Sequence, residues 1–220
     1  MTRIALLGDR STHRSHQELD ALIPRLADER GVEAVWVATG SGADLSAFDG
    51  VWLVPGSPYA DDDAVLAELT RIRTAGQPFL GTCGGMQYAV LELTRGLLGQ
   101  PATHAESDGA ADDNVVVPLA CALQGEERLV TPVPGTRFAG WCPEPFLGMH
   151  FCSYAASPAA IDALVAAGVV VGATAPDAGA EALEVPGHPF YVTSMFQPHV
   201  GAAAGEPIRP LIDAFLTAAG

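Results

Sequence analysis

The segment Gly81-Thr82-Cys83-Gly84-Gly85 constrains the fold of this chain more than any other feature. The apolar run at residues 78–80 predicts a buried strand, and residues 86–98 show helical spacing. A residue between a buried strand and a helix sits on a sharp turn, and small residues two before and two after it relieve the crowding of the backbone. The pattern therefore predicts an α/β fold with Cys83 on a strand-to-helix elbow.

The rest of the chain extends this pattern in both directions. Strands are predicted at residues 4–7, 32–37 and 50–54, and helices at 17–30 and 61–74. The second half is richer in strands, at residues 114–119, 128–132, 136–139, 148–154, 169–174, 182–185 and 190–195, with helices at 158–167 and 208–219. Strands that alternate with helices predict a mostly parallel central sheet covered on both faces. At 220 residues, we expect one domain spanning residues 1–220.

Charge and composition exclude several classes of partner. The chain has 26 acidic and 11 basic residues, a net charge of −15, which would repel phosphate backbones and anionic lipid. No apolar run approaches the length of a membrane span, and residues 1–8 are typical of a first strand rather than a signal peptide. We therefore expect a cytoplasmic protein that binds neither nucleic acid nor membranes.

The four cysteines show no CxxC pair and no zinc-type spacing, so reduced thiols without a metal are expected. No flavin motif is present either, and no cofactor is predicted. A G-x-x-x-x-G-K-[ST] phosphate loop is also missing, which argues against ATP-driven chemistry in this chain.

The position of Cys83 predicts a nucleophile. A helix N-terminus below the thiol favours the thiolate, which is the reactive form. The Gly84 N–H can hold a developing oxyanion, and the turn Pro55-Gly56-Ser57 after the preceding strand can supply a second donor from Gly56 or Ser57. The alternative is a structural cysteine in a glycine-rich loop.

These motifs resemble the glutaminase domain of CTP synthase, a class I glutamine amidotransferase, over nearly the whole chain. The matching stretches are residues 3–8, 54–57, 81–87, 181–190 and 196–198, and the closing helix after Pro210. Stand-alone proteins related to the CTP synthase C-terminal region are similar as well. The resemblance implies a flavodoxin-like three-layer sandwich, a Cys-His-Glu triad and an acyl-enzyme formed with an amide.

The chain departs from this family at the expected base. The family's F-H-P-E loop supplies the histidine and glutamate of the triad, whereas Phe196-Gln197-Pro198-His199 stands here. Gln197 occupies the histidine position, and a glutamine side chain accepts no proton at neutral pH. His199, in the glutamate position, and His104 are the candidates to take the proton from Cys83.

The remaining histidines have weaker assignments. His150 lies on a predicted strand whose alternation can turn it into the core, and Cys152 beside it is typical of a small core residue. His13 and His16 are expected at the exposed start of a helix, and His188 in a turn.

The predicted substrate contacts also differ from those of the family. The family's R-H-R-H-R-Y run clamps the glutamine carboxylate with arginine, but the equivalent segment here, residues 149–154, has no arginine and places Phe151 at the clamp. Gln87 and Glu106 do match family positions, and Glu106 corresponds to the acid that holds the substrate's ammonium group. The resemblance therefore implies a pocket for an amine or amide whose far end is apolar.

Three functions remain open at this point. The leading hypothesis is a cysteine-dependent enzyme acting on an amide or a related C–N or carbonyl small molecule other than free glutamine. The second is a glutaminase subunit that supplies ammonia to a separate synthetase. The third is a non-catalytic relative that binds a metabolite or a protein. A homodimer or a partner synthetase is the assembly that these hypotheses suggest.

Overall fold

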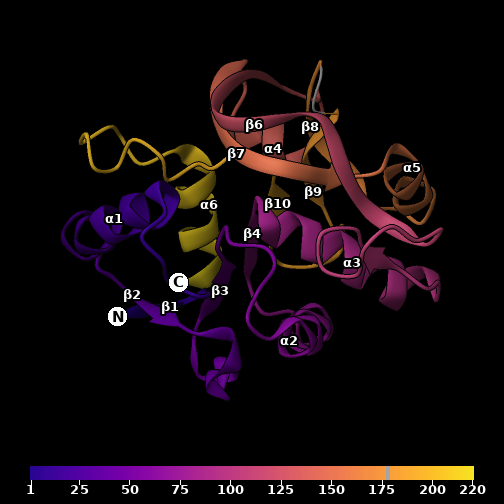
Figure 1. Ribbon diagram of the computed structural model, residues 1–220. Helices are drawn as coiled ribbons and strands as arrows, with labels where there is room; N and C mark the ends of the chain where they lie inside the picture. Colours follow the sequence, from indigo (N-terminus) through magenta and orange to yellow (C-terminus); the bar gives the residue numbers. More distant parts are fainter. Residues whose placement is uncertain (177–178) are drawn as a thin grey trace.

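The computed structural model describes residues 1–176 and 179–220 of the chain, arranged as a layer of strands between helices (Figure 1). The strands in this part of the chain are β1 Thr2–Leu7, β2 Val32–Val37, β3 Gly50–Leu53, β4 Phe79–Thr82, β5 Thr103–His104, β6 Asn114–Pro132, β7 Phe146–Ala156, β8 Val170–Ala175, β9 Gly179–Glu184 and β10 Tyr191–Ser194. The α-helices are α1 Arg14–Arg30, α2 Asp62–Ala75, α3 Gly84–Leu98, α4 Arg137–Trp141, α5 Pro158–Ala166 and α6 Pro210–Ala219. Two short 3₁₀ helices, η1 Thr39–Ser41 and η2 Leu45–Ala47, join β2 to β3.

The strands form a sheet with a parallel centre and an antiparallel extension. The order is β2-β1-β3-β4-β10-β9-β8-β6-β5, with β7 paired to β6. Neighbouring strands from β2 to β10 are parallel, whereas β9, β8, β6 and β7 follow with antiparallel pairing. The prediction of a mostly parallel central sheet is therefore confirmed. Because Leu53 pairs with Gly81, the loops that follow β3 and β4 leave the sheet side by side.

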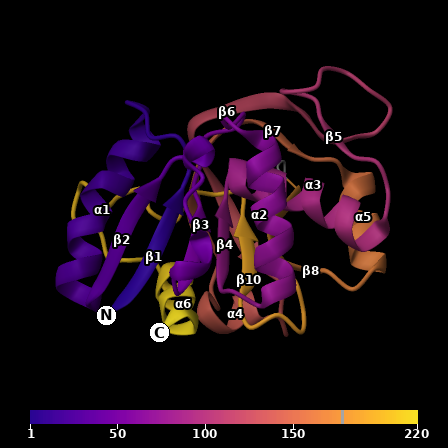
Figure 2. The ribbon, with the colours of Figure 1, turned by 90° about the horizontal axis from the view of Figure 1, so that it is seen from below.

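Helices cover both faces of this sheet. Leu69 of α2 and Val90 of α3 belong to the apolar cluster on one face, and Leu22 of α1 and Phe215 of α6 belong to the cluster on the other. Figure 1 shows α2 and α6 on opposite sides of β3 and β4, and Figure 2 shows α2 in front of the sheet with α3 running to the right of it. Strands buried on both faces have to be apolar along their length, which explains the uninterrupted apolar runs in the sequence.

The strand predicted at residues 136–139 is wrong, because these residues begin helix α4. Thr136 is the N-cap, and its hydroxyl oxygen accepts from the Ala139 N–H at 3.2 Å. Glu184 of β9 accepts the Phe138 N–H at 2.8 Å, which satisfies another free donor of the first turn. This second cap comes from a distant strand, so local propensity did not reveal it.

The strands predicted at residues 114–119 and 128–132 belong to one long strand, β6. Its pairing with β7 is irregular between Pro118 and Leu123 and again between Gln124 and Glu126. Gly125, inside the second irregularity, has a φ of +76°, which is typical of a β-bulge glycine. The bulges carry β6 across residues 120–127, which lie between the two predicted strands.

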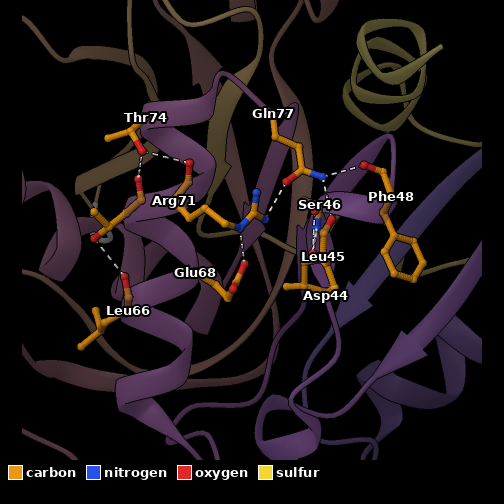
Figure 3. Close-up of polar contacts among 10 residues, drawn as sticks. Asp44, Leu45, Ser46, Phe48, Leu66, Glu68, Arg71, Thr74 and Gln77 are labelled. Atoms are coloured by element: carbon orange, nitrogen blue, oxygen red, sulfur yellow. Dashed lines mark hydrogen bonds and ion pairs between the residues drawn. The ribbon is translucent and has the colours of Figure 1, made fainter.

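A polar joint fixes the start of β4, the strand that leads to Cys83. Gln77, between α2 and β4, donates through Nε2 to the carbonyl oxygens of Leu45 (2.9 Å) and Phe48 (2.6 Å). Arg71 of α2 donates to Gln77 Oε1 at 2.7 Å and to Glu68 at 2.7 Å (Figure 3). These bonds tie the end of α2 to the loop before β3, and they set where β4 enters the sheet.

No helix in the described ranges is long and apolar enough to cross a membrane.

Candidate active site

Cys83 stands between β4 and α3 in a backbone conformation that side chains rarely adopt. Its φ is +53° and its ψ −109°, and within the described ranges it is the one residue other than glycine with a positive φ. Such a conformation costs roughly 1–3 kcal/mol, so surrounding contacts have to maintain it. The Cys83 N–H donates to the Ser194 carbonyl oxygen at 2.8 Å, and its own carbonyl accepts from the Met86 N–H at 3.0 Å. The turn thus has the form of the elbow that the sequence predicts.

The two glycines after Cys83 let the preceding strand and loop approach the elbow. A Cβ at Gly85 would collide with the carbonyl oxygen of Leu53 in β3. A Cβ at Gly84 would lie 2.9 Å from the Ser57 nitrogen and 3.3 Å from the Gly56 nitrogen. The N–H groups predicted as oxyanion donors, those of Gly84 and of Gly56 or Ser57, are therefore close together beside the start of α3.

His16 holds the loop after β3 in place. Its Nε2–H donates to the Pro55 carbonyl oxygen at 2.6 Å, and its Nδ1 accepts from the Ser11 N–H at 2.8 Å. The ring is 3% exposed. The expectation that His16 is a solvent-exposed residue is therefore wrong. Its spacing from Leu19, three residues on, places it on the apolar face of α1, and this was the signal available in the sequence.

The thiol of Cys83 meets strand β7. It donates to the Phe151 carbonyl oxygen at 3.7 Å, which brings Cys83 against the peptide that leads into Cys152. Cys83 and Cys152 are 5% and 4% exposed. Cys152, which the sequence analysis treated as a core residue, is therefore a direct neighbour of the predicted nucleophile.

The surroundings of Cys83 favour its thiolate. The hydrogen bond from the Cys152 thiol contributes most to lowering the pKa of Cys83, and it outweighs burial, which raises that pKa. The Gln197 side chain, the Gly84 N–H and the charge of His150 lower the pKa of Cys83 further. The reactive form is thus stabilised by several fixed groups, and not by a single proton acceptor.

His150 forms a buried pair with Glu181 of β9. The His150 Nε2 lies 3.0 and 3.1 Å from the two carboxylate oxygens, and Nδ1 lies 2.9 Å from the Gly148 carbonyl oxygen. Neither side chain is exposed. Burial alone would lower the pKa of His150, but the hydrogen bond and charge of Glu181 raise it above its usual value. Because both ring nitrogens face acceptors, the surroundings favour the imidazolium form of His150, which has no free nitrogen to accept a proton from Cys83.

Gln197 lies in the loop after β10, close to the thiol. Its backbone N–H donates to the Met149 carbonyl oxygen of β7 at 2.8 Å, which anchors the loop. The side chain is 2% exposed, and apart from its approach to the Cys83 thiol, neither its Nε2 nor its Oε1 has a hydrogen-bond partner in the described part of the chain. An amide that is buried without a partner beside a cavity is positioned to bond a ligand.

His199 faces away from the contacts that surround Cys83. Its Nε2 lies 3.0 Å from the Ser15 hydroxyl of α1, and its ring packs edge-on against Trp52 at a centroid distance of 5.7 Å. Burial is the main cause that lowers the pKa of His199 to about 3, and the neighbouring His16 contributes less. The described contacts therefore hold His199 against α1 as a neutral ring. None of them is a hydrogen bond to Cys83, which its predicted role as the base would require.

His104 belongs to a network that supports the cavity wall. Its Nδ1 accepts from the Glu106 N–H at 3.1 Å, so its Nε2 carries the hydrogen and donates to Gln87 Oε1, also at 3.1 Å. Gln87 donates to the Tyr154 carbonyl oxygen at 2.7 Å, and the Ser57 hydroxyl lies 2.9 Å from Gln87 and 3.1 Å from the Glu106 carboxylate. Burial lowers the pKa of His104 and raises that of Glu106. The network brings Gln87 and Glu106 together as predicted substrate contacts, whereas His104 stands behind them.

A cavity of about 550 Å³ opens above the elbow. Cys83, Cys152, Gln197 and Phe151 line it together with polar residues that include Asp9, Ser57, Gln87, Glu106, Gln124 and Ser153. No lysine or arginine belongs to its described lining. The charged groups of the cavity are thus acidic, and they favour a neutral or cationic ligand over an anionic one.

Phe151 forms the apolar side of this cavity. Its ring meets the His13 ring edge-on at a centroid distance of 5.3 Å, and the Arg14 guanidinium carbon lies 5.8 Å from its centre. These partners come from the start of α1, so α1 and β7 close the cavity from two sides. The side chain at the predicted carboxylate clamp is therefore a phenyl ring held in a packed position.

Sequence reasoning missed the contact of Cys152 with Cys83 and the pairing of His150 with Glu181. Alternation along β7 was the available signal, because His150 and Cys152 are two residues apart and share one face of the strand. Within the described ranges, no group of three or more histidine, cysteine and acidic residues has the arrangement of a metal site.

Comparisons with known proteins agree with this architecture, although no protein-family model matches the chain. The CTP synthase of Methanopyrus kandleri is 30% identical over 217 residues, covering 86% of this chain and 39% of that protein. The chain thus spans well under half the length of this curated relative. The glutaminase domain of the Trypanosoma brucei CTPS, solved with bound acivicin, superposes with a TM-score of 0.80 at 21% identity, covering 100% of this chain and 94% of that one. A glutamine amidotransferase from Thermotoga maritima gives a TM-score of 0.63 at 16% identity, covering 97% and 82%.

The 30% identity to a CTP synthase over 86% of the chain, together with the shared fold, shows that the chain belongs to the class I glutamine amidotransferases. Within that class, it is related to the glutaminase domain of CTP synthase.

Proposed function

We propose that this chain is a cysteine-nucleophile enzyme acting on an amide, or on a related C–N or carbonyl small molecule, other than free glutamine. The single observation that carries the proposal is the Cys83 elbow: a left-handed backbone, a lowered thiol pKa and a place on the wall of a cavity. An ordinary structural cysteine needs none of these features.

The proposed reaction begins with attack of the Cys83 thiolate on the substrate carbonyl carbon. The carbonyl oxygen becomes an oxyanion, and the N–H groups of Gly84 and of Gly56 or Ser57 are close enough together to hold it. Collapse of this intermediate breaks the C–N bond and leaves a thioester on Cys83, while the leaving nitrogen takes a proton from water in the cavity. A second water then hydrolyses the thioester, or an amine takes up the acyl group.

Cys83 acts in this proposal as a preformed thiolate. The lowered pKa of Cys83 favours loss of its proton, and this effect needs no histidine in contact with the sulfur. His104 places both ring nitrogens in other hydrogen bonds, and His199 places its Nε2 against the Ser15 hydroxyl, while its buried Nδ1 has no hydrogen-bond partner in the described part of the chain. We therefore assign His104 to positioning of Gln87, and His199 to packing between the final loop and α1.

The cavity lining supports a substrate with an amine at one end and an apolar group at the other. Glu106 provides a carboxylate beside Ser57 and Gln87, and its ordinary partner would be an ammonium group. Phe151 provides an apolar wall where glutamine would need a guanidinium for its carboxylate. The unpartnered amide of Gln197 can both donate to and accept from a substrate amide.

The test is turnover of a panel of amino-acid amides and short amine-bearing amides, followed by release of ammonia or amine. We expect turnover of at least one member by the wild-type chain and none by Cys83→Ala, whereas Cys121→Ala, which changes an exposed cysteine, should retain full activity. Full activity of Cys83→Ala would contradict the proposal.

A non-catalytic binding role is the second candidate, because Gln197 offers a buried hydrogen-bonding amide in place of a proton acceptor. It predicts saturable binding of a panel member, followed by calorimetry, with no release of product. Release of ammonia from free glutamine, alone or with a synthetase, would instead support the glutaminase subunit and contradict the role given to Phe151.

A further inference from the structure

A second reactive feature of the cavity is the pair of thiols from different elements. Cys83 comes from the elbow, and Cys152 comes from the middle of β7, 69 positions later in the chain. The Cys83 thiol donates to the carbonyl oxygen of Phe151 at 3.7 Å, and because Phe151 directly precedes Cys152, this bond places the elbow thiol against the peptide that leads into Cys152. Both side chains line the cavity of about 550 Å³, so a small solute can reach them although little of either is exposed.

The two sulfurs differ in their protonation. The hydrogen bond from Cys152 lowers the pKa of Cys83, whereas that bond to Cys83, followed by burial and the charges of Cys83 and Glu181, raises the pKa of Cys152 far above its usual value. Cys83 is therefore the sulfur that loses its proton more readily, and Cys152 is the sulfur that keeps it. A thiolate next to a protonated thiol is the arrangement in which one sulfur attacks and the other resolves.

We propose that Cys83 and Cys152 form a dithiol–disulfide couple that is oxidised by small hydroperoxides. The Cys83 thiolate attacks one peroxide oxygen, so that an S–O bond forms, the O–O bond breaks and hydroxide or alkoxide leaves. The Cys152 thiol then attacks the sulfenic sulfur, so that an S–S bond forms and the S–O bond breaks, and water leaves with the Cys152 proton. Two electrons pass from the two sulfurs to the peroxide.

This inference shares the reactive thiolate with the proposed function but needs no amide turnover. Oxidation would remove the nucleophile from any amide chemistry, and a dithiol reductant would return it. A chain that fails every amide assay can still form the disulfide, so the two proposals can fail separately.

The experiment exposes the full-length chain to hydrogen peroxide, blocks free thiols by alkylation, and maps cross-linked peptides by mass spectrometry before and after dithiothreitol. We expect a disulfide between Cys83 and Cys152, reversed by dithiothreitol, that forms about tenfold or more faster than oxidation at Cys121 or Cys142. Cys142 is a matched internal control, because burial raises its pKa to about 11.

Two variants separate disulfide formation by Cys152 from the reactivity of Cys83 toward peroxide alone. In Cys152→Ser, Cys83 should stop at the sulfenic acid, which dimedone traps, and should then over-oxidise, whereas Cys142→Ser should form the disulfide at the wild-type rate. The wild-type peptide map decides the matter even if Cys152→Ser does not fold. Independent oxidation of Cys83 and Cys152 without a cross-link, or a Cys83 that stays reduced while Cys121 reacts, would overturn the inference.

Discussion

The two sides of the cavity are built in different ways. The elbow side, formed by residues 53–57 at the end of β3 and residues 81–87 from β4 into α3, keeps the glycines and the loop that the resemblance to CTP synthase glutaminase domains predicts. The opposite side, formed by residues 149–154 of β7 and 196–199 after β10, carries Gln197, His199 and Phe151 where that family has histidine, glutamate and arginine.

The two sides show that some parts of the chemistry depend on the backbone and others on side chains. Cys83 obtains its conformation from the strand-to-helix geometry, and its neighbouring N–H groups are backbone donors. Proton transfer and carboxylate binding depend on single side chains, and these are the functions that the opposite side has exchanged. The elbow can therefore retain a reactive thiolate while the substrate and the source of protons change.

We expect the largest loss of stability on the side opposite the elbow, at the buried pair of His150 and Glu181. Glu181→Gln leaves the His150 imidazolium buried without its carboxylate, so the free energy of unfolding, measured by chemical denaturation, should fall by roughly 3–5 kcal/mol. The control is Glu33→Gln, which breaks the exposed pair with Arg3 and should change stability little. If both variants lost the same small amount, the buried pair would not be ionic.

On the elbow side, the corresponding change is Gly85→Ala. The added methyl group would collide with the Leu53 carbonyl oxygen, a backbone atom that cannot turn away, so we expect a loss of about 3 kcal/mol in unfolding free energy together with slower alkylation of Cys83. The matched control is Gly140→Ala in α4, because a Cβ there meets no atom within 4 Å. A Gly85→Ala chain as stable as this control would contradict the close approach of β3 to the elbow.

A pH effect should distinguish His199 from a working base. Because the folded pKa of His199, about 3, lies below the unfolded value of 6.5, the unfolded chain binds the proton first, and stability should fall as the pH drops below 6.5. This loss amounts to about 1.4 kcal/mol per pH unit, so His199→Gln should lose roughly 2 kcal/mol less than wild type between pH 7 and pH 5. The free energy of unfolding is measured by urea unfolding as a function of pH. Parallel curves for wild type and His199→Gln would mean that His199 titrates normally in the folded state.

The smallest effect is expected at Gln197. Its amide helps to lower the pKa of Cys83, so Gln197→Ala should shift the alkylation profile of Cys83 to higher pH and slow labelling at neutral pH by roughly two- to tenfold. Gln124→Ala is the control, because Gln124 also lines the cavity but bonds Ser153. Equal alkylation profiles of Cys83 in the two variants would mean that the Gln197 side chain does not help to lower the pKa of Cys83.

The sequence predicted what local patterns determine. Residues 78–98 encode a strand, an elbow and a helix in one continuous stretch, and the parallel centre of the sheet follows from the alternation of strands and helices. Glu106 and Gln87 were also placed in one pocket, because the resemblance matched their positions to family substrate contacts.

Features that depend on distant partners were not predictable in this way. The first turn of α4 is capped by Glu184, 46 positions after Phe138, and the His150–Glu181 pair joins residues 31 positions apart. His199 illustrates the same limit, because its position in the sequence suggested the active site while the Ser15 hydroxyl determines its orientation. Hydrogen bonds between segments far apart in the chain decided each of these cases.

We propose that Cys83 is a thiolate held by the elbow and its neighbours without a histidine base. The direct test is alkylation of Cys83 between about pH 5 and 9, followed by mass spectrometry, in wild type, His199→Ala and His104→Ala. We predict that Cys83 labels fast at or below neutral pH, with the same midpoint in all three chains. A Cys83 that labels like a free thiol of pKa about 8.5, or a midpoint that rises in either histidine variant, would contradict the account.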